Sequence, residues 1–243
     1  MRIAVAGGTG VVGRHVVDVA RERGHDVVVL SRSEGVDLTT GAGLAGRLDG
    51  VDAVIDTSNR TSQKRAESEA FFDDVTRTLL SAEAAAGVRH HIVLSIVGID
   101  DVDSGYYAGK RLQERVVAGG PVPWSVLRAT QFHEFAEQAL DFARIGPFSL
   151  VPRMLSQPVA AREVGAALVD LAEGEPVGRA PELAGPEPLQ MVDLARKVAR
   201  GRRRVVGVRV PGATGRAMRT GALVPKADGP RGVLTFDAWL ASR

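Results

Sequence analysis

Apolar runs and amphipathic segments alternate along the first half of the chain. Runs rich in valine, isoleucine and leucine occupy residues 2–6, 27–31, 51–56, 90–95 and 121–128. Between them, apolar residues recur at helical spacing over about 11–22, 62–86 and 106–118. The first pattern is typical of strands buried on both faces, and the second of helices that bury one face. The alternation predicts an α/β fold with a parallel sheet.

The second half of the chain is less regular, because prolines interrupt it repeatedly. Its pattern predicts helices at about 129–144, 162–173 and 191–200 and a strand at 204–210. We expect residues 1–243 to form a single three-layer Rossmann domain. Within it, about 148–243 would form a small C-terminal subregion that covers the cofactor cleft on the substrate side.

One crossover of such a fold is missing from the pattern. A parallel return between neighbouring strands needs about 10–12 residues. Only residues 33–35 separate the end of the second strand from the next apolar run at 36–38. Either the third strand is vestigial or this edge of the sheet is cut short. We expect 36–38 to be a loop or at most a short edge strand, and 41–48 to form a short helix.

Composition narrows the classes of function. The 243 residues include no cysteine, which excludes disulfides and thiolate chemistry. The chain starts with a strand and has no run near the roughly 20 apolar residues of a membrane span, so we expect a soluble, cytoplasmic protein without a membrane partner. Aromatic residues make up only 5%, which argues against a nucleobase-stacking surface. We expect no nucleic-acid partner and favour a solvated sheet edge for the basic group that would support one: Lys197, Arg200, Arg202, Arg203, Arg204 and Arg209.

The first strand stops at glycines, and a helix follows them. The run is Gly7-Gly8-Thr9-Gly10-Val11-Val12-Gly13. Gly7 permits a sharp turn, Gly10 lets the backbone approach a pyrophosphate, and Gly13 lets the helix pack on the strand. The free N–H groups at the helix start would then hold phosphates. This order predicts a dinucleotide site; glycines that serve packing alone are the alternative.

The end of the second strand bears on the choice of dinucleotide. An enzyme that prefers NAD usually carries a carboxylate there for the ribose 2′-OH, whereas an arginine suits a 2′-phosphate. This chain has Ser31-Arg32-Ser33. We therefore predict NADP in preference to NAD, with Arg32 as the phosphate partner and Arg14 as a second candidate. The alternative for Arg32 is a solvated surface cation.

A phenol and an ammonium lie one helical turn apart after the fourth apolar run. The spacing Tyr106-x-x-x-Lys110 puts both on one helix face, and the preceding strand ends at Ser95. The cation would lower the pKa of the phenol, so that Tyr106 exchanges a proton with a carbonyl or hydroxyl while a hydride moves. Lys110 would also bind the nicotinamide ribose, and Ser95 would steady the substrate oxygen. Tyr107 is the rival phenol.

Several segments together resemble one enzyme superfamily. They are the N-terminal glycines and residues 94–99, 106–114 and 123–135. The chain is similar to the atypical short-chain dehydrogenases known as NmrA-like or NAD(P)H-binding proteins. This resemblance implies cofactor contacts at Asp37-Leu38, for the adenine, and at Thr57-Ser58-Asn59. Its spacing also favours Tyr106 over Tyr107.

The resemblance leaves two functions open. We favour an NAD(P)H-dependent oxidoreductase that acts on a small apolar carbonyl, quinone or aromatic metabolite. The alternative is a dinucleotide-binding redox sensor without catalysis. We expect no metal site, and the substrate and the oligomeric state stay open. The predicted cofactor residues are Gly7, Thr9, Gly10, Val11, Val12, Gly13, Arg32, Asp37, Leu38, Thr57, Ser58 and Lys110.

Overall fold

The predicted strands form one sheet in the computed structural model, which describes residues 1–141 and 143–243. Its strands are β1 (Arg2–Ala6), β2 (Asp26–Leu30), β3 (Ala53–Asp56), β4 (His90–Ile96), β5 (Trp124–Ala129) and β9 (Gly178–Arg179). Among the described residues the sheet has six strands in the order β2-β1-β3-β4-β5-β9. The fold is α/β with a parallel central sheet, as predicted.

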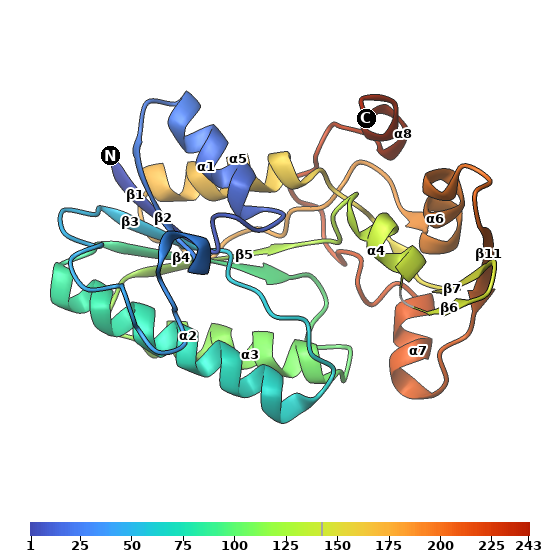
Figure 1. The fold of residues 1–243 in the computed structure, drawn as a ribbon, viewed down its shortest axis with the longest axis horizontal. Coiled ribbons are helices and arrows are strands. Elements are labelled where there is room, and N and C mark those ends of the chain that lie inside the picture. Colours follow the sequence, from blue (N-terminus) through green and yellow to red (C-terminus); the bar gives the residue numbers. More distant parts are fainter. Residues whose placement is uncertain (142) are drawn as a thin grey trace. The chain divides into compact units, whose positions relative to one another are not determined.

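Helices cover both faces of this sheet. They are α1 (Gly13–Glu22), α2 (Arg65–Ala86), α3 (Gly105–Ala118) and α5 (Ala161–Glu173). α1 and α5 lie on one face, and α2 and α3 lie on the other (Figure 1). Each helix buries its apolar stripe, such as Val16 and Ala20 in α1 and Phe72 and Leu79 in α2. Burying these stripes against the sheet produces the expected three layers.

The edge of the sheet beside β2 is cut short, as the sequence predicts. After β2 the chain makes a single 3-10 turn (η1, Arg32–Glu34). Asp37 then forms an isolated bridge with Ala42, so residues 36–38 belong to a loop. The described chain between η1 and β3 has no crossover helix.

The helix predicted at 41–48 is wrong, because this segment is a series of turns. Glycines at 41, 43, 46 and 50 have φ values of 76°, 75°, 72° and 69°. An α-helix needs negative φ, and glycine adopts the positive values without a Cβ clash. Leu44 and Leu48 nevertheless pack with Leu30 and Leu79 in the core. Their spacing resembles a helical stripe because both side chains must reach the same side of the sheet.

The chain divides into two compact units. The first comprises Met1–Ser95, Ser104–Arg128 and Arg162–Pro181, and the second comprises Ile96–Asp103, Ala129–Ala161 and Glu182–Arg243. That the whole chain acts as one domain, with about 148–243 on the substrate side, stays a prediction. In the described part of either unit, no helix is long and apolar enough to cross a membrane.

The second unit contains short strands and helices. They are α4 (Phe135–Asp141), β6 (Arg144–Ile145), β7 (Phe148–Pro152), β8 (Leu155–Ser156), β10 (Leu189–Gln190), α6 (Met191–Ala199), β11 (Arg204–Val208), α7 (Gly212–Arg219) and α8 (Phe236–Ala241). Strands β11, β7 and β6 form one sheet, and β10 pairs with β8. The helix predicted over 129–144 begins only at Phe135, because Ala129 still belongs to β5 and Phe132 bridges to Val159.

Candidate functional site

The glycine turn after β1 is packed so closely that side chains are excluded from Gly7 and Gly13. Gly7 has φ 71°, and a Cβ there would lie 2.9 Å from the Cα of Ser58. A Cβ on Gly13 would lie 2.1 Å from the carbonyl oxygen of Gly7. At Gly10, the nearest atom to an added Cβ is that same oxygen, at 3.1 Å. Gly7 and Gly13 therefore fix the turn, whereas Gly10 keeps its outer side open.

The start of α1 presents backbone N–H groups beside this turn. Val12 is the N-cap, and no side chain of the described residues caps the first helical turn. Thr9 and Gly10 are exposed, and Val11 is half-buried. An uncapped helix start with open glycine backbone attracts anions through its free N–H groups and its dipole. The predicted residues 7–13 thus lie together in an arrangement that fits a phosphate group.

The residues that follow β3 lie against the same turn. The Thr57 hydroxyl donates to the carbonyl of Ala6 at 2.8 Å and so ties β3 to β1. The Ser58 backbone N–H donates to Asp56 Oδ1 at 2.8 Å. The Ser58 hydroxyl oxygen is buried and has no hydrogen-bond partner among the described residues. Such a group usually finds a partner, so Ser58 fits a ligand contact better than Thr57 does.

The other predicted cofactor residues near β2 lie in the loop that follows it, and they differ in exposure. Arg32 is exposed in η1, where the hydroxyls of Ser31 and Ser33 lie 2.9 Å apart. The side-chain hydroxyl and backbone N–H of Thr39 bind Asp37 and, with help from Arg32, lower the pKa of that carboxyl. Leu38 is buried in the core. The structure therefore leaves Arg32 open to a ligand and uses Asp37 and Leu38 to hold the loop.

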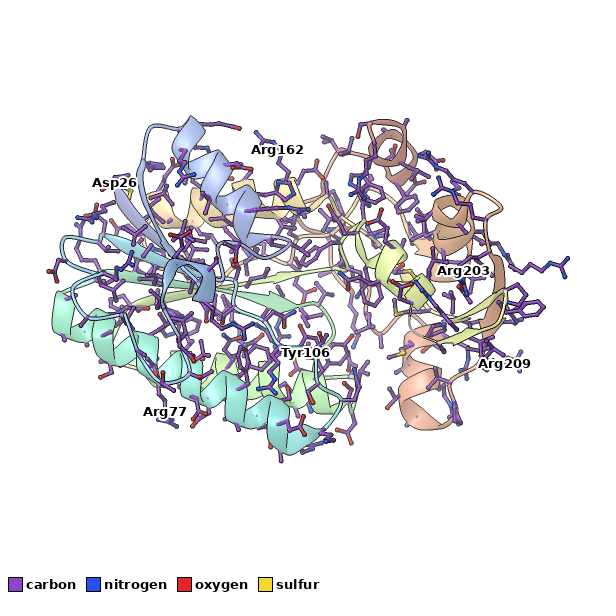
Figure 2. All side chains as sticks on the ribbon, in the orientation of Figure 1. Asp26, Arg77, Tyr106, Arg162, Arg203 and Arg209 are labelled. Atoms are coloured by element: carbon purple, nitrogen blue, oxygen red, sulfur yellow. The ribbon has the colours of Figure 1, made fainter. Side chains whose placement is uncertain are left out.

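Tyr106 and Lys110 belong to α3, which covers one face of the sheet together with α2 (Figure 1). Tyr106 is labelled on that side of the sheet in Figure 2. Ser104 starts this helix by accepting a hydrogen bond from the backbone N–H of Tyr107. The Tyr106 hydroxyl donates to Asn59 Oδ1 at 2.8 Å. Asn59 follows β3 in the chain, so the phenol lies at the carboxyl end of the sheet. Parallel sheets place their ligands at this edge.

Lys110 is 4% exposed, and its ammonium lies at the same edge. It donates to the carbonyl of Leu94 at 2.6 Å and to Gln113 Oε1. Burial lowers the pKa of Lys110 to about 8, against the opposing effects of the Asp56 and Glu114 carboxylates. The ammonium is therefore charged at neutral pH and lies close to losing its proton in mild base.

The structure changes one part of the expected phenol chemistry. Burial raises the pKa of Tyr106 to about 12, although its bond to Asn59 acts in the other direction. The expected lowering by Lys110 is therefore wrong for this structure. The Lys110 ammonium instead faces the Phe72 ring at 4.8 Å from its centroid, and the Tyr106 ring lies 6.1 Å from that same ring. Tyr106 is a fully protonated phenol at neutral pH.

Ser95 lies in β4, but its hydroxyl is used inside the protein. It donates to Glu114 Oε1 at 2.6 Å, and Ser95 is buried. Glu114 also accepts from Arg128 Nε at 2.8 Å and Nη2 at 2.7 Å and pairs with Arg179 Nη1 at 3.0 Å. Burial raises the pKa of Glu114, but the hydrogen bonds from Arg128 and Ser95 lower it further. The structure thus brings Ser95 to a buried ion cluster and not to Tyr106.

Three residues at this site carry interactions that the sequence did not reveal: Asp56, Gln113 and Glu114. Gln113 and Glu114 come three and four positions after Lys110, which places them on the same side of α3. Polar residues on a buried helix face were the available signal. A glutamine and a glutamate in a helix are more often solvated, so the signal is weak.

Known proteins add an independent finding. A family model described as NAD(P)H-binding matches residues 34–173, which is more than half of the chain. The chain belongs to the NAD(P)H-binding family. The glycine turn precedes the matched residues, so its role in binding phosphate stays a prediction. Family membership makes a nicotinamide dinucleotide the cofactor class of this protein.

A curated relative and several solved structures resemble this NAD(P)H-binding protein. The (4-alkanoyl-5-oxo-2,5-dihydrofuran-3-yl)methyl phosphate reductase of Streptomyces griseus subsp. griseus is 31% identical over 222 residues, 82% of this chain and 74% of the relative. A short-chain dehydrogenase/reductase superfamily protein from Agrobacterium tumefaciens with bound NAD has TM-score 0.71 and 22% identity, covering 100% of this chain and 95% of that one. The NADPH-dependent quinone oxidoreductase of Escherichia coli, complexed with NADPH, has TM-score 0.71 and 17% identity, with 99% of each chain covered. The two structures show a shared fold, and the relative makes the chain reductase-like.

Proposed function

We propose that this protein is an NAD(P)H-dependent reductase of a small, largely apolar carbonyl, quinone or aromatic compound. The observation that carries the proposal is that a protonated phenol, Tyr106, and a buried ammonium, Lys110, both lie at the carboxyl edge of the sheet. The glycine turn and Ser58 lie at the same edge, where their open polar groups fit a dinucleotide. A bound NAD(P)H supplies the hydride.

The raised pKa of Tyr106 supports reduction in preference to oxidation. A reductase must give a proton to the oxygen that gains negative charge as hydride arrives at the carbonyl carbon. Tyr106, with its pKa near 12, holds that proton throughout the neutral range. The Tyr106 hydroxyl would give its proton to the substrate oxygen, and water would restore it. The product is an alcohol that has gained one hydride and one proton.

The described residues fill two of the three N–H positions on the Lys110 ammonium. The third is available to a hydroxyl of the dinucleotide. Lys110 would therefore hold the cofactor, while Tyr106 serves the substrate. This division of roles replaces the direct tuning of the phenol that the sequence predicts.

We propose NADPH as the preferred cofactor because Arg32 is exposed at the end of β2 and no carboxylate precedes it there. A guanidinium can bind a 2′-phosphate through two parallel hydrogen bonds. Cofactor fluorescence titration should show tighter binding of NADPH than of NADH, and Arg32→Ala should weaken NADPH binding alone. Arg77→Ala, on the outer side of α2 (Figure 2), is the matched control. Equal affinities for both cofactors in the unmodified protein would disprove the preference.

The substrate class is supported by the Streptomyces relative. By its name, that reductase acts on a ring that bears an oxo group, an alkanoyl group and a methyl phosphate, so it supports the carbonyl and not the apolar part of the class. We therefore propose that the ligand of this chain contains a carbonyl or quinone oxygen within reach of the Tyr106 hydroxyl.

The test measures NADPH oxidation with three compound classes: a quinone, an unsaturated keto-lactone and an aromatic aldehyde. Tyr106→Phe should lower turnover by about 10²–10⁴-fold and leave NADPH affinity unchanged. Lys110→Ala should weaken binding and lower turnover together. The matched control is Tyr107→Phe, which removes a neighbouring phenol and should keep normal turnover. Turnover that survives Tyr106→Phe would overturn the proton role, and NADPH binding without oxidation of any class would favour the sensor.

A further inference from the structure

A chain of hydrogen bonds connects the end of β3 to the Lys110 ammonium. Asp56 Oδ2 accepts a hydrogen bond from Gln113 Nε2 at 2.8 Å. Gln113 Oε1 then accepts a hydrogen bond from Lys110 Nζ. Gln113 is fully buried, Asp56 is 1% exposed and Lys110 is 4% exposed, so water does not compete for these bonds.

The chemistry of Asp56, Gln113 and Lys110 allows this series of hydrogen bonds to run in one direction only. The Asp56 carboxylate only accepts hydrogen bonds, and the Lys110 ammonium only donates them. The Gln113 amide has one donating and one accepting end, so its NH₂ must face Asp56 and its oxygen must face Lys110. A buried amide held at both ends cannot rotate without leaving two groups unsatisfied.

The other oxygen of Asp56 holds the opposite part of the site. It accepts the backbone N–H of Ser58 at 2.8 Å. Ser58 contacts the Gly7 turn and has the buried hydroxyl without a partner among the described residues. One carboxylate therefore fixes the backbone that carries the Ser58 hydroxyl and, through Gln113, orients the remaining N–H of Lys110.

We propose that Asp56 and Gln113 are positioning residues that aim the Lys110 ammonium and the Ser58 hydroxyl at the dinucleotide and keep the ammonium protonated. This inference rests on the proposed role of Lys110 in holding the cofactor. It adds that cofactor affinity depends on pH through Lys110, and that Asp56 and Gln113 set the pH at which affinity is lost.

The charges around Lys110 fix the sign of this dependence. Asp56 on β3 and Glu114 on α3 face it with negative charge, α2 contributes the neutral Phe72 ring, and β4 contributes the Leu94 carbonyl. Burial lowers the pKa of Lys110 to about 8, and both carboxylates oppose that effect. Removing Asp56 or the amide bridge should let the ammonium lose its proton at lower pH. Affinity that needs the ammonium is present below this pH and lost above it.

The experiment is an NADPH fluorescence titration from pH 6 to 10 on the intact protein. The unmodified protein should keep its affinity at low pH and lose it with a midpoint near 8. Gln113→Met keeps the side-chain volume and removes both hydrogen bonds, and Asp56→Asn removes the charge. Each should lower the midpoint by about one pH unit and weaken binding about threefold at pH 7.5. The matched control, Gln138→Met on α4, should match the unmodified protein.

Carbon NMR of the lysine ε-carbons in the cofactor-free protein gives a second readout. The Lys110 signal should titrate near pH 8 and move to lower pH in both variants. A merely structural role would weaken binding at every pH without moving either midpoint, and that result would overturn the proposal. If Gln113→Met fails to fold, Asp56→Asn alone must shift the titration.

The outcomes separate this inference from the proposed function. Shifted midpoints without turnover of any compound would leave the positioning role intact and remove the reductase. Turnover that depends on Tyr106, with midpoints unmoved by both variants, would keep the reductase and remove the positioning role. Absence of any NADPH binding would remove both.

Discussion

Two polar clusters are centred on neighbouring residues of α3, Lys110 and Glu114, and they differ in how completely their groups are paired. Around Glu114, both carboxylate oxygens accept two contacts each, from Ser95, Arg128 and Arg179. We call this the closed cluster. Around Lys110, one ammonium N–H and the neighbouring Ser58 hydroxyl have no acceptor or donor among the described residues. We call Lys110, Gln113, Asp56 and Ser58 the open cluster.

The difference separates a structural use of buried charge from a functional one. A fully paired buried charge stabilises a particular arrangement, and removing a partner leaves the other charge exposed to a low-dielectric interior. A buried charge that lacks some of its hydrogen-bond partners costs folding free energy, and a ligand that supplies the missing partner can recover it. Because Glu114 and Lys110 are only one helical turn apart, they share a backbone environment. A difference between the effects of substituting Glu114 and Lys110 therefore reflects how completely each charge is paired.

The largest expected effect is on stability in the closed cluster. Glu114→Ala leaves Arg128, whose side chain is 13% exposed, without its carboxylate and should lower the free energy of unfolding by about 3–5 kcal/mol. Urea unfolding measures this. Glu137→Ala, which removes an exposed partner of Arg243, should cost less than about 1 kcal/mol. A Glu114 effect as small as this control would show that the closed cluster does not hold the fold.

The open cluster should instead show its effect in the pH dependence of stability. Burial lowers the pKa of Lys110 from 10.5 to about 8 in the folded chain. Between these values the unfolded state binds the extra proton, so the unmodified protein should gain stability relative to Lys110→Met as pH rises. The gain should approach about 1.4 kcal/mol per pH unit. Parallel stability curves for the two proteins between pH 8 and 10 would contradict the buried, charged lysine.

A smaller effect is expected at Ser95. Ser95→Ala removes one buried hydrogen bond to Glu114 and should cost about 1 kcal/mol of unfolding free energy. Turnover should stay within about twofold, because the structure gives this hydroxyl to Glu114 and not to the substrate. A rate loss as large as that of Tyr106→Phe would restore the substrate contact that the sequence predicts and would move Ser95 to the open cluster.

The smallest effect is expected at Arg179, whose side chain is 61% exposed although it pairs with buried Glu114. Solvent screens an exposed ion-pair partner, so Arg179→Ala should change the free energy of unfolding by less than about 1 kcal/mol. Measured beside Glu114→Ala, it tests whether Arg128 carries most of the pairing. An effect close to that of Glu114→Ala would mean that Arg179 is required to close the cluster.

Local patterns in the sequence were enough to predict most of the fold. Over residues 1–128 the strands, the helices before β4 and β5 and the Gly7–Gly13 turn depend on neighbouring residues, and each was expected near its observed place. Short elements further along, such as β9, α7 and α8, were not predicted. The missing crossover was also predictable, since chain length alone excludes it. The turns at 41–50 were not, because Leu44 and Leu48 have helical spacing while the intervening glycines choose positive φ. The spacing of apolar residues indicates which side chains are buried, but it does not indicate the conformation of the backbone between them.

The clusters were harder to predict than the elements that carry them. Tyr106 and Lys110 could be found because they are one turn apart on one helix. Ser95, Glu114 and Arg179 come from three separate segments, and their meeting depends on the finished sheet. The direction of the Tyr106 pKa shift also depends on packing, since burial outweighs the hydrogen bond to Asn59. The tertiary structure decides both the meeting of these residues and the direction of the pKa shift, and no short stretch of sequence contains that information.

The position of Glu114 has a mechanical consequence. The chain leaves the first unit after Ser95, after Arg128 and after Pro181. Ser95 and Arg128 are themselves partners of Glu114, and Arg179 lies two residues before Pro181. A single carboxylate therefore contacts residues at or near all three points where the polypeptide leaves the first unit. Tension applied along any crossing reaches the same carboxylate, so the three segments should loosen together and not one at a time.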